Sequence, residues 1–406
     1  MMDARMTTRM NRRMNTRMNT RMPLSNIDSP SLLLLALLLV AGCRASGNAG
    51  SDAGVTKLAI VFDDSLGQAS LGSEGKRGAM LAVEEHGADF RAVYFNDAAA
   101  VDAAREAVVA VGFTDSDELR VAMPAFAAAG TPVMVAGATD PCLLTMSGAE
   151  LLSFACYSDP MQGAAMAEFA YERLAVRETV VLFDAKSEFA SAVGAAFTTA
   201  FRGLPAGKTA VVAFSSDVEG AITTALAKKP QAIYLAALPQ DGPRVTSALR
   251  MRGFTGAVLG PDSFDEPEIF NAQGLGVVYY STHAWLAGKG EPAVDAFVAR
   301  YRQRFGGAEP TAFAALGYDA TRIAVAAIAR AQSGGVVTRA TVGRAMREFA
   351  SSSTPFEGIT GTIAPAANER FPRKSVWIIE ATDGKRQLAS RWEPVKIPDP
   401  SCGKLR

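Results

Sequence analysis

Residues 108–140 read VVAVGFTDSDELRVAMPAFAAAGTPVMVAGATD, and this stretch decides the fold. The apolar runs Val108–Phe113 and Val133–Ala136 predict two buried strands, and between them Asp117–Ala129 has the apolar spacing of a helix. We expect this helix to end at Gly130, because glycine readily adopts the left-handed conformation that closes many helices. Strands that are apolar on both faces are typical of parallel sheets covered by helices, so the stretch indicates a β–α–β unit.

The same alternation of short apolar runs and amphipathic stretches continues on both sides of this unit. Further strands are predicted at residues 57–62, 91–95, 179–183, 210–214, 232–237 and 257–259. Further helices are predicted at residues 74–86, 98–106, 161–174, 187–201, 218–228 and 244–251. This alternation predicts a doubly wound α/β fold.

The pattern changes after residue 292, where long helices are followed by short strands. The helices are predicted at residues 292–305, 311–332 and 339–349, and the strands at 358–363, 375–380 and 387–392. Asp383-Gly384 lies between the last two strands and predicts a hairpin turn.

The N-terminus predicts export and lipid attachment. Leu32–Val40 is an apolar run that, at ~1.5 Å per helical residue, spans about half of a ~30 Å hydrocarbon core, as a signal peptide does. Val40-Ala41-Gly42-Cys43 resembles the lipobox of bacterial lipoproteins; the alternative is an ordinary signal peptide with a chance cysteine. We interpret residues 1–42 as a signal peptide with an extended N-region, and residues 43–55 as a lipid-anchored flexible tether.

Length and charge restrict the partners of the exported part. Without the signal peptide, the chain has room for two domains of roughly 150 residues each. Residues 1–42 hold six of the 41 basic residues but only two of the 41 acidic ones, so the remainder is mildly acidic. No basic stripe remains, and we expect no nucleic-acid partner.

Three cysteines remain after Cys43 is assigned to the lipid. Cys142 and Cys156 are close in sequence, and in an oxidising compartment this spacing predicts a disulfide that stabilises by on the order of 3 kcal/mol. The alternative is two buried free thiols. Cys402 lies in a polar tail without a remaining partner, so we predict a free thiol there.

The sequence shows little that would support catalysis. The chain has only two histidines, His86 and His283, and no Cys-x-x-Cys pair, so a zinc site is not expected. It has no Gly-x-Ser-x-Gly elbow, and Ser70 occupies the place of the first glycine of a phosphate loop. We expect no metal, no cofactor and no enzymatic activity; an envelope hydrolase is the alternative from another class.

Candidate ligand groups lie where strands end and helices begin. Gly112–Asp117 and Gly137–Asp140 are two such junctions. Ligands of doubly wound sheets bind outside the carboxyl ends of the strands, where helix N-termini offer unpaired N–H groups. The alternative is that Ser, Thr and Asp here only cap helices.

From Lys57 to Glu380 the order of residues resembles the type I periplasmic binding proteins, specifically the leucine/isoleucine/valine-binding branch that serves ABC importers. The resemblance rests on motifs in the family's order: Gly112–Asp117, Gly130-Thr131-Pro132, Gly137-Ala138-Thr139, Ser158–Gly163, Val180–Asp184, Leu259–Asp262, Leu316–Ala320 and Phe356–Gly361. It implies two lobes with doubly wound parallel sheets, joined by three crossover segments. We place the first lobe at residues 56–160 and 283–367, the second at 161–282 and 368–395, and a tail at 396–406.

The resemblance also implies a ligand site between the lobes. Ser116, Ala138 and Thr139 match the positions that hold a ligand carboxylate, and Asp262 matches the acid that binds an α-ammonium. The alternative is that Asp262 merely caps the turn before Phe264.

Several positions depart from the amino-acid-binding pattern. Phe189 and Leu238 stand where such members place tyrosines, and Leu71 replaces an aromatic residue. Asp115 and Asp117 add negative charge beside the carboxylate positions. The pocket is therefore expected to be less aromatic, with a ligand that differs from a branched-chain amino acid.

Together these features predict a lipid-anchored receptor in the cell envelope, on the periplasmic face or at the cell surface. It would capture an amino acid, an amide or a related polar solute and deliver it to ABC permease subunits. The alternative is a ligand-sensing or regulatory lipoprotein of the same fold. Arg44 follows Cys43, and in Gram-negative lipoproteins that resemble this one a non-aspartate residue there points to the outer membrane.

Overall fold

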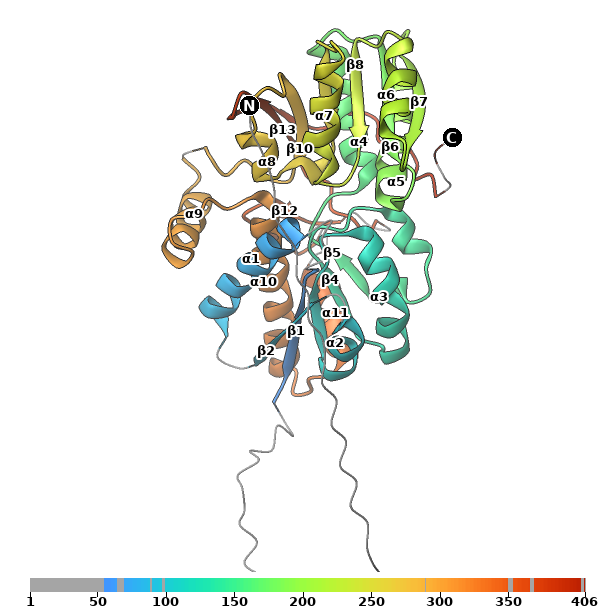
Figure 1. Cartoon of the computed structure of the whole chain (residues 1–406). Coiled ribbons are helices and arrows are strands. Elements are labelled where there is room, and N and C mark those ends of the chain that lie inside the picture. Colours follow the sequence, from blue (N-terminus) through green and yellow to red (C-terminus); the bar gives the residue numbers. More distant parts are fainter. Residues whose placement is uncertain are drawn as a thin grey trace, which may run out of the picture. The chain divides into compact units, whose positions relative to one another are not determined.

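The computed structural model describes residues 55–63, 69–87, 90–96, 99–288, 290–349, 353–365, 369–402 and 405. The predicted signal peptide, Cys43 and nearly all of the tether lie outside the described residues. The described part forms two parallel-sheet lobes with helices on both faces of each sheet (Figure 1).

The first lobe is built on a five-stranded sheet with the order β2-β1-β3-β4-β5, in which neighbouring strands are parallel. The strands are β1 (Lys57–Val61), β2 (Arg91–Phe95), β3 (Val109–Gly112), β4 (Val133–Val135) and β5 (Leu152–Phe154). The helices are α1 (Ala69–His86), α2 (Ala100–Glu106), α3 (Ser116–Ala129), α10 (Ala312–Ser333) and α11 (Arg339–Phe349), and the 3₁₀ turns are η2 (Pro141–Thr145) and η3 (Ala149–Leu151).

Close helix packing forms part of this lobe's core. Helices α1 and α10 lie side by side, and a Cβ atom on Gly317 would fall 2.0 Å from the carbonyl oxygen of Gly75. Glycine at this crossing therefore allows the two backbones to touch. Helix α10 is long and apolar enough to cross a membrane, but 78% of its apolar window is buried inside the protein, as in a core helix.

The second lobe is built on a seven-stranded sheet with the order β14-β13-β10-β9-β8-β6-β7. The strands are β6 (Glu178–Asp184), β7 (Lys208–Phe214), β8 (Ala232–Ala236), β9 (Ala257–Gly260), β10 (Val278–Thr282), β13 (Val376–Thr382) and β14 (Lys385–Trp392). The helices are α4 (Asp159–Glu172), α5 (Glu188–Arg202), α6 (Val218–Ala227), α7 (Asp241–Met251) and α8 (Pro267–Asn271), and η4 is the 3₁₀ turn Asp262–Phe264.

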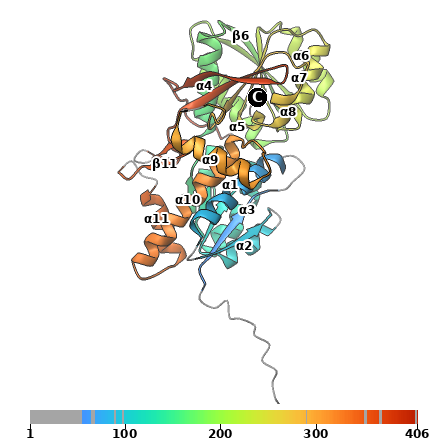
Figure 2. The same cartoon turned by 90° about the vertical axis from the view of Figure 1, so that its left-hand side faces the viewer.

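This second sheet is covered on both faces. Val180 and Leu182 of β6 belong to one hydrophobic core, whereas Val181 and Phe183 belong to another. Strands buried in this way have apolar residues at every position. Only β13 and β14 run antiparallel to their neighbours, at one edge of the sheet (Figure 2).

The chain passes between the two lobes three times. The first crossing joins β5 to α4, and the second joins β10 to α9 (Pro292–Arg304), which packs on α1 and α10. The third joins β12 (Gly361–Ile363) to β13. The predicted α/β class with two doubly wound lobes and three crossover segments is thus confirmed, while the residue boundaries of the lobes stay a prediction.

A few elements differ from the sequence-based expectation. The strand β5 was not predicted, and the single strand expected at residues 358–363 is a hairpin of β11 (Phe356–Gly358) and β12. Gly361 has φ +94°, a conformation that favours a tight turn over a continuous strand. The hairpin expected at Asp383-Gly384 is present, and both residues have positive φ.

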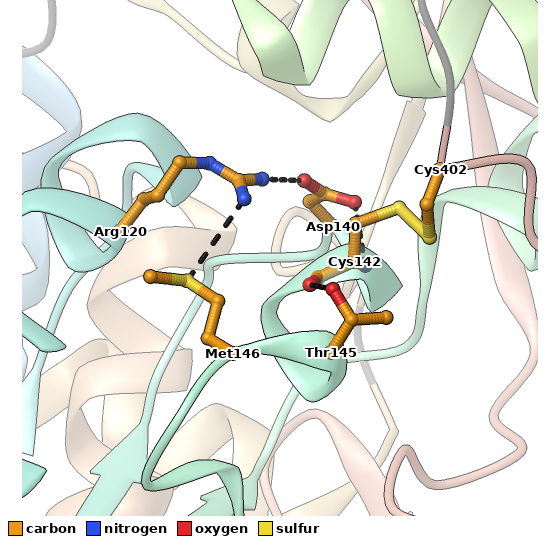
Figure 3. Close-up of a disulfide and its surroundings, with 6 residues drawn as sticks. All are labelled: Arg120, Asp140, Cys142, Thr145, Met146 and Cys402. Carbon is orange, nitrogen blue, oxygen red and sulfur yellow. Dashed lines mark hydrogen bonds and ion pairs between the residues drawn. A yellow bond between two sulfur atoms is a disulfide. The ribbon is translucent and has the colours of Figure 1, made fainter.

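The cysteine pairing corrects the predicted disulfide. Cys142 is bonded to Cys402, with a sequence separation of 260 (Figure 3). Cys156 is a buried free thiol. Cys156 follows β5 inside the first lobe and approaches the carbonyl oxygen of Ala138, so it does not reach Cys142. The Cys142–Cys156 bridge and the free Cys402 were both wrong, because closeness in sequence does not show where the C-terminal tail returns.

Candidate ligand-binding cleft

The loops at the carboxyl ends of the parallel strands enclose a small cavity between the lobes. Its first-lobe wall consists of Leu71, Thr114, Asp115, Ser116, Gly137 and Phe313. Its second-lobe wall consists of Phe189, Asp262 and Ser263. The cavity has a volume of about 10 Å³, which is room for about one water molecule. The lobes are therefore in close contact across the cleft.

The first-lobe wall begins at the N-terminus of α3. Asp115 caps this helix, and its Oδ1 accepts a hydrogen bond from the N–H of Asp117 at 2.7 Å. Phe113, just before the loop, has φ +60°, a strained conformation for a large side chain. The Oγ of Ser116 accepts a hydrogen bond from the N–H of Asp140 at 3.2 Å, and Asp140 pairs with Arg120. The loops after β3 and β4 are thereby fixed to each other.

Asp117 forms a direct link between the lobes. Its carboxylate accepts a hydrogen bond from the Ser187 hydroxyl at 2.9 Å and one from the Phe189 N–H at 3.3 Å. Both donors lie at the start of α5, so the first lobe supplies an additional cap for a second-lobe helix. A second link runs from the Ser70 hydroxyl to Glu266.

Asp262 lines the cavity, but its carboxylate also has partners within the protein. It accepts a hydrogen bond from the Gln162 amide at 3.1 Å and lies 2.8 Å from Nε2 of His283. The Asp262 N–H donates to the Gln162 side-chain oxygen at 3.0 Å, and that oxygen also accepts from Ser281. Burial lowers the pKa of His283, and the Asp262 hydrogen bond opposes this shift. Asp262 therefore joins η4 to α4 and to the second crossing, and its side-chain partners are Gln162 and His283 and not the N–H groups of η4.

Thr139 points toward the first crossing. Its hydroxyl is hydrogen-bonded to Asp159, and its carbonyl oxygen accepts the Asp159 N–H at 2.9 Å. Asp159 is fully buried, and burial raises its pKa well above the ordinary value. Asp159 also accepts a hydrogen bond from Gln162 at 2.9 Å, so Thr139 and Asp262 belong to one buried polar network.

The structure brings together four of the seven predicted ligand residues: Leu71, Ser116, Phe189 and Asp262. Ala138, Thr139 and Leu238 do not line the cavity, and all seven ligand contacts remain predictions.

Five further lining residues complete the wall. Thr114, Asp115 and Gly137 lie in the two junction loops that the sequence pointed to, whereas Ser263 and Phe313 were missed. Phe313 is the second residue of α10, which begins at Ala312 after the N-cap residue Thr311, and the start of this predicted helix was the signal that could have identified it.

The cleft is acidic. Burial and the nearby charge of Asp117 raise the pKa of Asp115 to about 7. Burial raises the pKa of Glu266 to about 8. These buried acids favour a neutral or positively charged group beside them over a second anion. No group of three His, Cys, Asp or Glu residues that could hold a metal ion occurs among the described residues.

The fold and this site agree with a known protein family. Residues 55–386 match the family described as periplasmic binding protein, and this chain belongs to that family. The match confirms the resemblance to type I periplasmic binding proteins of the leucine/isoleucine/valine-binding branch. A search among curated proteins returned no match.

Several solved structures share the fold. A leucine-binding protein, LivK, from Thermotoga maritima is 26% identical, with a TM-score of 0.75 over 84% of this chain and 99% of its own. The branched-chain amino-acid transporter substrate-binding protein LivJ from Streptococcus pneumoniae, in complex with isoleucine, is 21% identical, with a TM-score of 0.71 over 82% and 99%. An ABC transporter solute-binding protein from R. palustris, in complex with benzoate, is 18% identical, with a TM-score of 0.70 over 87% and 100%.

Family membership has direct consequences for this chain. Periplasmic binding proteins work outside the cytoplasm, and they typically bind small molecules without transforming them.

Proposed function

We propose that this protein captures a small polar or amino-acid-like ligand between its lobes and delivers it to an ABC permease. One observation carries the proposal: loops from both lobes enclose a single cavity, and Asp117 hydrogen-bonds across the cleft. Closure of two lobes on a ligand excludes water and strengthens polar contacts inside. We further propose that the protein is held in the cell envelope by lipid on Cys43.

The cavity wall supports a ligand with an apolar part and a positively charged part. Leu71, Phe189 and Phe313 provide an apolar side. Asp115 and Asp262 provide acidic groups, and hydroxyl groups lie next to each of them. An ammonium or amidinium group fits the acidic side, because a buried acid is stabilised by a paired cation.

A thermal-shift screen against amino acids, amides and small acids tests the ligand. A ligand present at 100 times its Kd adds about 2.7 kcal/mol to the free energy of unfolding. The best hit should lose affinity in Phe189→Ala and keep it in the matched control Phe349→Ala, whose side chain packs against the first-lobe core. Equal affinity in wild type and Phe189→Ala would place the ligand elsewhere.

The second candidate is a sensor lipoprotein of the same fold, favoured by Arg44 after Cys43. Uptake of the identified ligand by cells with and without the gene separates the two. Transport requires slower uptake in the deletion strain, whereas a sensor leaves uptake unchanged and alters a downstream response.

A further inference from the structure

We infer that a second cavity, at the three crossing segments, binds a small aromatic monocarboxylate and that this binding biases the position of the lobes. The cavity has a volume of about 440 Å³, within the ~300–1,000 Å³ typical of small-molecule sites. Among the described residues it shares no lining residue with the cleft cavity. A molecule bound here therefore does not compete for the cleft.

Every crossing contributes to the wall of this second cavity. Met161 lies just after the first crossing, Trp285 lies in the second, and Lys374 lies in the third. Arg391 and Ile397 add the end of β14 and the tail. The lobes of such a fold rotate about their crossing segments, so the spacing of these groups changes with lobe position. A ligand that contacts them binds the two lobe positions with different affinity and shifts the equilibrium between them.

The apolar part of the wall is aromatic. Two of the chain's three tryptophans, Trp285 and Trp377, line the cavity, and both are half-buried. Val294 and Ile359 line it as well, and they are buried. A flat ring placed against such a wall gains buried apolar area and ring–ring contact.

The charged part of the wall favours an anion. The charged side chains that line the cavity are Arg373, Lys374, Arg391, Glu291 and Glu393, and of these Arg373 is paired with Glu369 at 2.7 Å. Arg391 lies 5.2 Å from the ring centroid of Trp377, and its Nε donates to Ser375 at 2.9 Å. A guanidinium carries five N–H donors and pairs with a carboxylate in a bidentate geometry, so Arg391 can hold a carboxylate while the attached ring lies on the tryptophan wall.

The acidic residues limit the charge of the ligand to one. Glu393 accepts a hydrogen bond from the Ser375 hydroxyl at 2.9 Å, which places its carboxylate near the Arg391 contact. A second anionic group on the ligand would be repelled there. The buried Lys374 amine donates to the Ala155 carbonyl oxygen at 3.0 Å and to the Thr360 hydroxyl, near Asp319, so the carboxylate contact is assigned to Arg391.

Calorimetric titration of the purified protein with 1-naphthoate tests this site, with the neutral 1-naphthamide as the matched ligand. We expect the wild type to bind naphthoate and to bind the amide at least 10-fold more weakly. Arg391→Gln and Trp285→Ala should each bind naphthoate at least 10-fold more weakly than the wild type does. Arg105→Gln, an exposed arginine on α2, and the cleft variant Phe189→Ala should bind naphthoate as wild type does.

Two results would overturn the proposed site. One is the absence of naphthoate binding to the wild type. The other is binding that Phe189→Ala removes and Arg391→Gln leaves intact, because the molecule then occupies the cleft. Circular dichroism checks that the variants are folded, and Trp377→Phe replaces Trp285→Ala if the latter is not. Small-angle X-ray scattering at saturating naphthoate tests the coupling: an unchanged radius of gyration would refute it.

Discussion

Asp117 shows how one side chain can favour the closed arrangement of the lobes. It accepts hydrogen bonds from Ser187 and from the Phe189 N–H, at the start of a helix that belongs to the other lobe. Removal of one partner from a buried hydrogen bond costs about 1–3 kcal/mol. Asp117→Ala should therefore depopulate the closed form and weaken ligand binding by about 10-fold or more, as measured by calorimetry. Asp102→Asn, at an exposed position of α2, is the control, and equal affinity of Asp117→Ala and wild type would contradict this role.

The raised pKa of Asp115 predicts how the free energy of unfolding changes with pH. The folded-state pKa of about 7 lies above the ~3.9 of an unfolded aspartate, so between these values the folded protein holds a proton that the unfolded chain has released. The free energy of unfolding should therefore fall as pH rises from about 4 to 7, and Asp115→Asn should reduce this slope in chemical denaturation.

The ionisation of Asp115 also shows which end of a bound ligand lies beside this residue. A ligand ammonium should bind more tightly as pH rises from 6 to 8, because Asp115 becomes ionised, whereas a ligand carboxylate should bind more weakly. Calorimetry at both pH values reports the sign, and a pH-independent affinity in wild type would exclude direct contact with Asp115.

Two measurements are needed to separate a structural role of Asp262 from a role in ligand binding. The resemblance assigned Asp262 to the ligand's α-ammonium, so Asp262→Asn was expected to weaken ligand binding. In the structure His283 and Gln162 already pair with it, so Asp262→Asn should first lower the free energy of unfolding by about 1–3 kcal/mol. Denaturation and calorimetry on the same variant separate the roles: unchanged stability with lost affinity would restore the ligand-cation hypothesis.

At the scale of the elements, the C-terminal tail is the feature with the largest consequence. Val395 and Lys396 donate backbone N–H groups to Glu168 of the second lobe, and six residues later Cys402 is bonded to Cys142 of the first lobe. The disulfide closes a loop across most of the chain, and loss of such a bond costs about 2–5 kcal/mol. Cys402→Ser should lower the free energy of unfolding by this amount, whereas the buried Cys156→Ala should lack that loop-closure effect.

Mass spectrometry of the unreduced protein tests the pairing directly. A Cys142–Cys402 peptide is expected, and Cys156 should resist alkylation in the folded state, because it is fully buried and burial raises the pKa of its thiol. A Cys142–Cys156 peptide would contradict the Cys142–Cys402 pairing.

The elements that the sequence predicted are those defined by local periodicity. The β–α–β unit around residues 108–140 appears as β3, α3 and β4, with Gly130 in the left-handed conformation that ends the helix. The strand β5 was missed because it is only three residues long and directly precedes a crossing, without a turn signal on both sides. The disulfide was misassigned because the return of the tail depends on tertiary packing.

At the scale of the whole molecule, the sequence located the loops of the site but not the contacts between lobes. The loops after β3 and β4 follow from the rule that ligands lie at the carboxyl ends of strands. The Asp117–Ser187 hydrogen bond joins residues 70 positions apart, and the Ser70–Glu266 bond joins residues 196 apart. Such pairs depend on how the two lobes meet, which no local pattern of residues records.

The position of the molecule in the envelope is tested by Cys43→Ala. The cysteine follows an apolar run too short to span a bilayer, in the context Val40-Ala41-Gly42-Cys43, and it lies outside the described residues. Acyl chains contribute about 0.8 kcal/mol per buried CH₂, and stable attachment needs more than one chain. Loss of the modified thiol should therefore shift the protein from the membrane to the soluble fraction while leaving ligand affinity unchanged, since the predicted tether separates Cys43 from β1. Fractionation of cells that express each form measures this, and a mutant that still sediments with membranes would contradict lipid attachment at Cys43.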